Sequence, residues 1–225
     1  MAIRVIDDTK LQNIALAIQS KDGGGKMYVT EMRGRIEALQ VGNPYQVMND
    51  YIEDTLTRLR LNNVPSGKLR YIQPGNGKIN GASQTIQRIE LPNNSDDLDV
   101  WQFGNMRNLL FFDSGYTQKF DNVCLNGCTS LMWIVVRKGD SIPTLFSSIA
   151  ISLSNVGRIA VVPELIEDYK NGTNWSYWAD KFRNLYFANS NDELEALLLN
   201  GDVPDESMIV CDYNETYYVK GEGIV

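Results

Sequence analysis

Apolar residues near the start of the chain recur at a helical spacing. The first set stands at i, i+3, i+4 and i+7, on one stripe of a helix. It consists of Leu11, Ile14, Ala15 and Ile18. Three glycines at 23–25 end this helix, and Thr30 can cap a second one. Two short helices are too small to be stable alone, so we expect them to pack on another surface.

A third helix is predicted to begin at Pro44. Its apolar residues step by 3, 4, 4 and 3, which is typical of a short coiled-coil seam. The seam residues are Tyr45, Met48, Ile52, Leu56 and Leu59. They fit either an oligomerisation surface or a helix packed inside its own domain. Residues 61–82 are rich in glycine, proline and asparagine and are predicted to form a loop-rich linker.

A repeated pattern follows the linker. The segment from Phe103 to Phe112 recurs 22 residues later, from Leu125 to Ile134. Flanking strands extend the pattern, with steps of 23, 22 and 25 between Ile89, Phe112, Ile134 and Ile159. A period of this length with one apolar strand per turn is typical of a leucine-rich-repeat solenoid. Leu109 and Leu131 hold equivalent places and are expected to point into its core.

The last residues predict a small unit of a different kind. Ser190 and Glu193 match a capping box before a helix with Leu194, Leu197 and Leu198. Residues 208–211 and 216–219 then read as the two strands of a β-hairpin. The predicted fold class is α+β, with a helical attachment and oligomerisation module at 1–60, the linker at 61–82, a capped solenoid at 83–189 and a helix plus hairpin at 190–225.

Composition argues against several classes of function. The 225 residues carry a net charge of −7, which offers no basic footprint for nucleic acid. Histidine is absent, which removes histidine-dependent nucleophiles and His-ligated zinc sites. Three cysteines do not form a disulfide framework, and we expect buried thiols in a reducing cytosol. The charged opening residues predict no signal peptide, and no apolar run is long enough for membrane insertion.

Candidate chemistry in the sequence is limited to binding. Asp96, Asp97 and Asp99 are adjacent loop residues, and a glycosidase needs two carboxylates at a set distance across a cleft. We therefore predict a non-enzymatic protein with no catalytic residue, no metal site and no cofactor. Trp101, Tyr116 and Trp133 are the candidate glycan contacts, because aromatic rings supply contact area at low entropic cost. Trp133 also fits a place in the core.

Two segments resemble known families. The first is Leu11-x-x-Ile14-Ala15-x-Ala17-Ile18-x-x-Lys21-x-Gly23, followed by Glu31-Met32-x-x-x-Ile36, which is similar to the opening module of tail proteins from phages of Gram-positive bacteria. The second is Leu125-x-Gly127-Cys128-Thr129-Ser130-Leu131-x-x-Ile134, which resembles BspA-like leucine-rich repeats. The ending Val162-Pro163-x5-Tyr169-Lys170-x3-Asn174-Trp175-Ser176 looks like the terminal cap of those repeats. In this cap, Trp175 and Trp178 are expected to pack in the core.

These resemblances imply a structural protein of a virion, made in the bacterial cytoplasm and placed in a phage tail, baseplate or receptor-binding fibre. Its expected partners are other virion proteins, copies of itself in a trimer, and a host cell-surface glycan. Residues 1–42 are expected to contact virion neighbours, while residues 83–189 face outward. The alternative is a glycan-binding bacterial surface adhesin, which would need an export signal.

Overall fold

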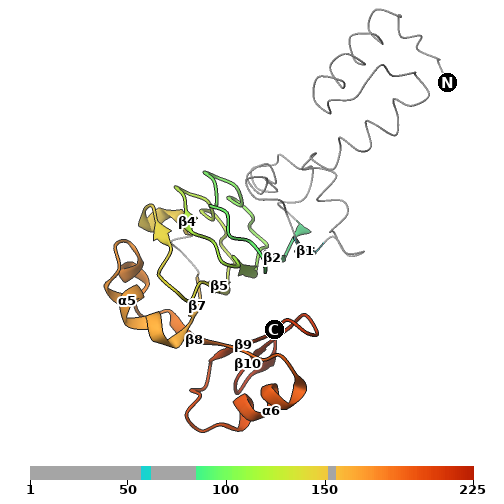
Figure 1. Cartoon of the computed structure of the whole chain (residues 1–225). Coiled ribbons are helices and arrows are strands. Elements are labelled where there is room, and N and C mark those ends of the chain that lie inside the picture. Colours follow the sequence, from blue (N-terminus) through green and yellow to red (C-terminus); the bar gives the residue numbers. More distant parts are fainter. Residues whose placement is uncertain (1–56, 62–84, 152–155) are drawn as a thin grey trace, which may run out of the picture. The chain divides into compact units, whose positions relative to one another are not determined.

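The computed structural model of the chain describes residues 57–61, 85–151 and 156–225. Contacts divide the chain into the units Met1–Asp50 and Tyr51–Val225, and every described residue belongs to the second unit. The predicted helical pair, the seam residues Tyr45, Met48, Ile52 and Leu56, and linker residues 62–82 therefore lie outside the described residues (Figure 1).

The described residues of this unit are organised around a nine-stranded mixed sheet. Its first seven strands pair in parallel with their neighbours and follow one another in chain order. They are β1 (Arg58–Arg60), β2 (Arg88–Glu90), β3 (Phe111–Asp113), β5 (Trp133–Val135), β7 (Arg158–Val161), β8 (Phe182–Phe187) and β9 (Met208–Cys211). β10 (Thr216–Val219) and β11 (Gly223–Ile224) complete the sheet in antiparallel pairing (Figure 1).

One row of the sheet forms the interior of the stacked turns. The middle residues of the first strands pair with one another in register, and none of them is exposed. They are Leu59, Ile89, Phe112, Ile134 and Ile159. The predicted spacing of the repeat from Ile89 to Ile159 is thus confirmed. Leu109 and Leu131 are both fully buried, as their equivalent places in the pattern predict.

The connections between strands repeat as well. A second, two-stranded parallel sheet joins β4 (Lys119–Phe120) to β6 (Thr144–Leu145), and Leu98 bridges to Phe120 beside it. Asn105 and Gly127 hold equivalent places in consecutive turns and both have positive φ, and a Cβ at Gly127 would collide with the side-chain oxygen of Asn105. The same tight turn is therefore built in consecutive repeats.

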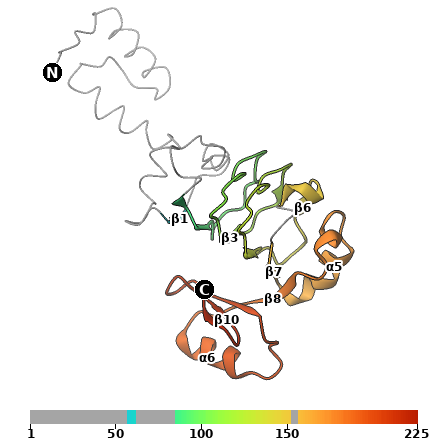
Figure 2. The same ribbon diagram turned by 180° about the vertical axis from the view of Figure 1, so that it is seen from behind.

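An aromatic cluster closes the turn between β7 and β8. The chain passes through η4 (Pro163–Leu165), α5 (Ile166–Asn171) and η5 (Trp175–Trp178). The Trp175 ring lies 5.1 Å from that of Tyr169 and 5.5 Å from that of Phe120, and its Nε1–H donates to the carbonyl of Pro143. Trp175 and Trp178 are buried, which confirms their predicted place in the core. Figure 2 shows α5 beside the strands β7 and β8.

The predicted C-terminal elements form where the sequence places them. Ser190 caps α6 (Asn191–Leu199), with its hydroxyl accepting from the Glu193 backbone N–H. Leu194 packs with Ile209 and Cys211 of β9, and β9 and β10 form the predicted hairpin. β9 also pairs in parallel with β8, however, and this pairing sets Leu185 beside Met208.

The predicted fold class is wrong. Within the described residues, a strand-rich, curled mixed sheet dominates and only two α-helices occur, of 6 and 9 residues. Leu59, expected on a helical seam, lies in β1 and is fully buried against its own chain. The C-terminal hairpin is not a separate sheet, because β9 pairs with β8 and so continues the same sheet, and α6 packs on β9.

Candidate functional site

The sheet curls until its two ends face each other across one surface, here called the inner face. On β3, β5 and β9 it carries the first and third residues, and on β10 the second and fourth, because side chains alternate along a strand. Tyr217 of β10 and Phe111 of β3 are five strand spacings apart, about 24 Å in a flat sheet. Their ring centroids are only 4.8 Å apart. The chain's own C-terminal hairpin therefore packs against the inner face.

A buried ionic cluster fastens the hairpin to this face. The Arg137 guanidinium binds the Asp113 carboxylate at 2.6 Å, and the Tyr217 hydroxyl donates to the same carboxylate at 2.7 Å. Arg137 also donates to both carboxylate oxygens of Asp212, in the turn between β9 and β10. Burial opposes the charge of Arg137, but the Asp113 carboxylate outweighs it, so the pKa of Arg137 is raised and the guanidinium stays charged.

A second ionic group joins the hairpin to the first strands. Glu90, which is completely buried, accepts from Arg58, Arg60 and Arg88. Glu215, in the hairpin turn, lies 3.5 Å from Arg60. A buried carboxylate needs such partners, since an unpaired charge would be costly at this depth.

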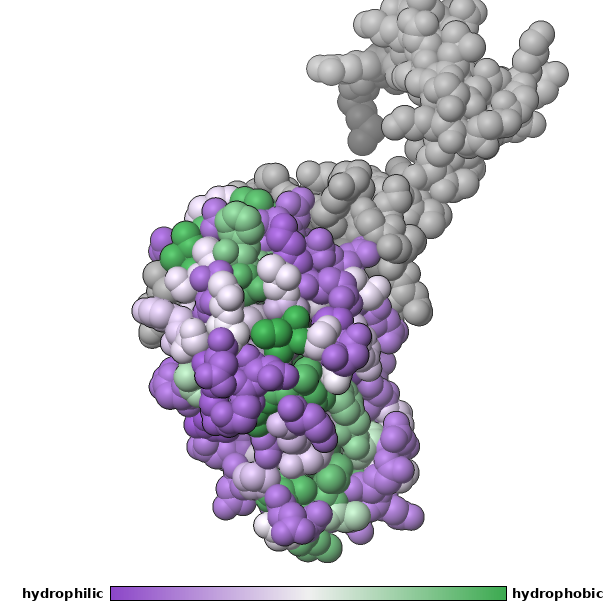
Figure 3. Space-filling view, turned by 60° about the vertical axis from the view of Figure 1, so that its left-hand side comes forward, coloured by the Kyte–Doolittle hydropathy of each residue, from purple (hydrophilic) through white to green (hydrophobic). Residues whose placement is uncertain are grey.

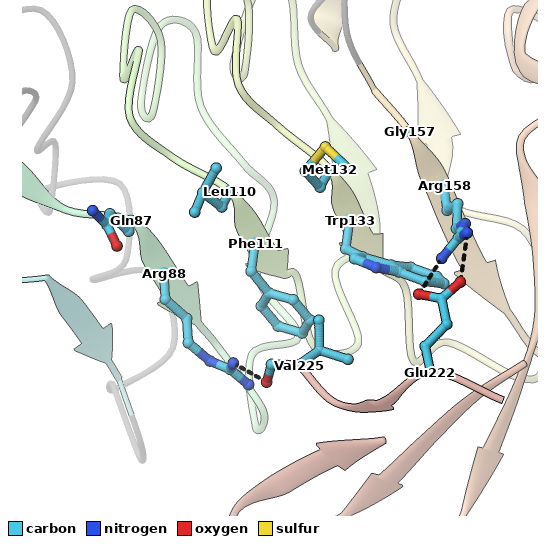
Figure 4. Close-up of a pocket in the computed structure, with 10 residues that line it drawn as sticks. All are labelled: Gln87, Arg88, Leu110, Phe111, Met132, Trp133, Gly157, Arg158, Glu222 and Val225. Carbon is cyan, nitrogen blue, oxygen red and sulfur yellow. Dashed lines mark hydrogen bonds and ion pairs between the residues drawn. The ribbon is translucent and has the colours of Figure 1, made fainter. Parts of the chain in front are cut away.

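Beside the hairpin the inner face opens into a pocket of about 500 Å³, here called the strand-edge pocket. It lies where the four parallel strands β2, β3, β5 and β7 begin, and it takes the first residue of each strand and the residue before it (Figure 4). The lining residues are Gln87, Arg88, Leu110, Phe111, Met132, Trp133, Gly157, Arg158, Glu222 and Val225. A side chain at position 157 would come within 2.8 Å of the Met132 carbonyl oxygen, so glycine keeps this wall clear.

An arginine stands at each end of the pocket, and both arginines are paired with carboxylates. Arg88 lies 4.2 Å above the Phe111 ring and donates to the backbone carbonyl of Val225 at 2.6 Å. Arg158 lies 5.1 Å above the Trp133 ring and pairs with Glu222 (Figure 4). It also pairs with Glu206. The hydrogen bond to Glu222 raises the pKa of Arg158. Both guanidinium groups keep about a fifth of their side-chain surface exposed.

The accessible floor of the pocket is aliphatic rather than aromatic. Phe111 and Trp133 are each only 4% exposed, because the arginines and Tyr217 cover their rings. Leu110 and Met132 are 42% and 55% exposed. On the face drawn in Figure 3, hydrophobic side chains are visible in patches between hydrophilic ones. Exposed aliphatic side chains inside a concave site are typical of protein recognition more than of sugar stacking.

The three predicted glycan contacts occupy different settings. Trp101 lies in a turn before β3 and Tyr116 follows the end of β3, and both side chains are exposed. Trp133 opens β5, is buried, and lines the strand-edge pocket. All three cysteines are buried; burial raises the pKa of the Cys128 thiol to about 12.

Most pocket residues were missed from the sequence, although a signal for them was present. Arg88, Phe111, Trp133 and Arg158 each stand immediately before one of the four aligned positions of the repeat. The same repeat alignment, taken at the position before each buried residue, places these four residues in a single row. The contributions of Glu222 and Val225 could not be found in this way, because they come from the curled end of the sheet.

Among the described residues, no group of histidine, cysteine, aspartate or glutamate side chains is arranged to hold a metal ion. A search of the same residues finds no helix with the length and apolar character needed to cross a membrane. Compared with known proteins, the chain matches no family model, no curated protein and no solved structure.

Proposed function

We propose that the protein is a non-enzymatic structural component of a phage tail, baseplate or receptor-binding fibre, with its stacked turns serving as a scaffold for recognition. The observation that supports this role best is the strand-edge pocket. It is built from equivalent positions of four consecutive turns, and ionic clusters hold the surrounding backbone in place. A preformed concave site on a rigid scaffold is the usual arrangement for binding.

The net negative charge of the chain supports a contact with the host surface that does not depend on long-range electrostatic attraction. With a net charge of −7, an attractive field toward anionic wall polymers is not available. Recognition then depends on apolar packing and directed hydrogen bonds, with weak dependence on salt. In this proposal residues 1–42 attach to other virion proteins, and residues 83–189 face solvent or the host surface.

The second candidate is the glycan-binding surface adhesin. The exposure of Trp101 and Tyr116 favours it, since exposed rings can stack on sugars. The strand-edge pocket favours a protein partner instead, because its aromatic rings are covered and its open floor is aliphatic.

Imaging of particles separates these roles. Phage particles from the bacterial source are labelled with an antibody raised against the purified protein and viewed by electron microscopy. We expect label at one end of the tail. Label restricted to the bacterial wall, with bare particles, would overturn the virion role and favour the adhesin.

A further inference from the structure

Three asparagines in the described part of the chain are followed directly by glycine. Asparagine is a chemically labile residue, and a following glycine has no Cβ to shield the asparagine side chain from attack by the glycine backbone nitrogen. The pairs are Asn126–Gly127, Asn171–Gly172 and Asn200–Gly201. Since the dipeptide is the same in each, a difference in reactivity must come from the fold.

The pair at the end of α5 is held by hydrogen bonds on both reacting groups. The Gly172 N–H donates to the carbonyl of Tyr169 at 3.2 Å, so the attacking nitrogen is engaged. The Asn171 side-chain amide donates to the carbonyl of Glu167 at 2.8 Å, so the attacked group is engaged as well. Both bonds must open before this pair can react.

The pair in the stacked turns is held by packing. The carbonyl of Asn126 accepts the backbone N–H of Asn105 at 2.7 Å, and the N–H of Asn126 donates to Val123 at 3.2 Å. The side-chain oxygen of Asn105 stands directly against Gly127, and both residues of the pair are half-buried. Rotation of this peptide therefore requires the two turns to separate.

The pair after α6 is open (Figure 1). Asn200 and Gly201 are both exposed, and no atom lies within 4 Å of the position that a Cβ on Gly201 would take. Within the described residues, the Gly201 N–H makes no hydrogen bond. The Asn200 Oδ1 accepts from the Asp202 N–H at 2.9 Å, which holds the side-chain carbonyl in the same turn as the Gly201 nitrogen. This N–H also stabilises the negative charge that develops on Oδ1 during an attack at Cγ.

We propose that Asn200 is a site of spontaneous deamidation. The Gly201 nitrogen passes its proton to a base in solution and bonds to Asn200 Cγ. The bond from Cγ to Nδ2 breaks, and the amide leaves as ammonia after taking up a proton, so that a cyclic imide remains. Water then opens the imide at Cγ to give aspartate, or at the backbone carbonyl carbon to give isoaspartate. Water is the only co-reactant, and nothing is oxidised or reduced.

The surroundings of Asn200 accommodate the product. Either product carries a new carboxylate, which the exposed Asp202 and the C-terminal end of α6 disfavour. The Lys220 ammonium donates to the carbonyls of Asn200 and Val203, and it offsets this repulsion. The modified chain is therefore expected to stay folded.

Peptide mass spectrometry of the full chain tests the proposal. The protein is incubated in mildly alkaline buffer made with oxygen-18 water, folded in one sample and unfolded in urea in the other. Incorporation of the heavy oxygen counts conversion at each asparagine. Asn76 and Asn80 also precede glycines but lie outside the described residues, and their peptides are scored separately. The matched variant is Gly201→Ala, for which the fold has room.

In the folded protein, Asn200 should convert at least about tenfold faster than Asn126 or Asn171, because each hydrogen bond that must open first slows the reaction severalfold. In urea the three rates should come together. Gly201→Ala should slow conversion at Asn200 alone, because its methyl group hinders the attacking nitrogen.

Two outcomes would overturn the proposal. One is an Asn200 that converts no faster than the other two in the folded protein. The other is a preference for Asn200 that persists unchanged in urea, because the flanking sequence and not the fold would then set it. The inference uses only the described residues and does not depend on the proposed virion role.

Discussion

Removal of the Arg137 guanidinium should be among the most damaging single changes to this fold. Arg137→Met keeps the aliphatic length but deletes the bonds to Asp113, Tyr217 and Asp212. Asp113, which is completely buried, would keep the Tyr217 hydroxyl and the Gly115 N–H as partners but would lose its counter-charge. Leaving a buried charge unpaired costs about 3–5 kcal/mol.

The matched control removes the other carboxylate that Arg137 binds. Asp212 is 53% exposed, so water can replace the guanidinium once the ion pair is lost. Asp212→Asn should therefore cost about 1 kcal/mol or less. Tyr217→Phe should be intermediate, at about 1.5–3 kcal/mol, because it removes the hydrogen bonds that the hydroxyl makes with the buried charged groups of Asp113 and Arg137.

Urea unfolding at pH 7, followed by tryptophan fluorescence, measures all three free energies of unfolding. The expected order of cost is Arg137→Met, then Tyr217→Phe, then Asp212→Asn. If Arg137→Met cost no more than Asp212→Asn, the idea that this cluster fastens the hairpin to the inner face would have to be abandoned.

Two further predictions concern the core and the surface. Leu131→Ala should lower the free energy of unfolding by about 2–5 kcal/mol, because it opens a cavity in the buried interior of the turns. Leu110→Ala, at a half-exposed position, should lower it by about 1 kcal/mol or less in the same urea assay. Equal losses of stability in the two variants would contradict the predicted repeat register. Hydrogen bonds from Arg183 and Arg158 lower the pKa of Glu206 in the folded state, so its stabilising contribution is present above pH 4.5 and is lost as the pH falls through the lowered value. Glu206→Gln should therefore flatten the decline in melting temperature below pH 4.5, and an unchanged acid decline would count against these ion pairs.

The repeat register and the C-terminal elements could be predicted from the sequence because both depend on local spacing. The row through Ile89 and Phe112 follows from a fixed step along the chain, and α6 follows from Ser190 and Glu193 at capping distance. The fold class could not be predicted because closure of the inner face depends on partners such as Phe111 and Tyr217, which lie far apart in the sequence and whose contact no periodic pattern specifies.

The error at Leu59 has a simple physical origin. A three-residue strand such as Arg58–Arg60 is too short to display an alternating pattern, and its one buried leucine also fits a helical step from the preceding apolar residue. The strand could not be recognised because it is short, and not because its residues have a low β propensity. The strand-edge pocket could not be predicted in full for a different reason, because Glu222 and Val225 come from the far end of the sheet.

The bonds between Asp113 and Tyr217 also bear on how the chain acquires its structure. The two residues are 104 positions apart, and Arg88 reaches a carbonyl 137 positions away. On the ribosome the early turns are made first, yet Phe111 and Trp133 stay uncovered until the last strands emerge. Contacts of such long range slow folding, and apolar surface exposed during the delay favours aggregation. Truncation after residue 189 should thus leave nascent chains that depend on chaperones for solubility, whatever the intrinsic stability of the turns already made.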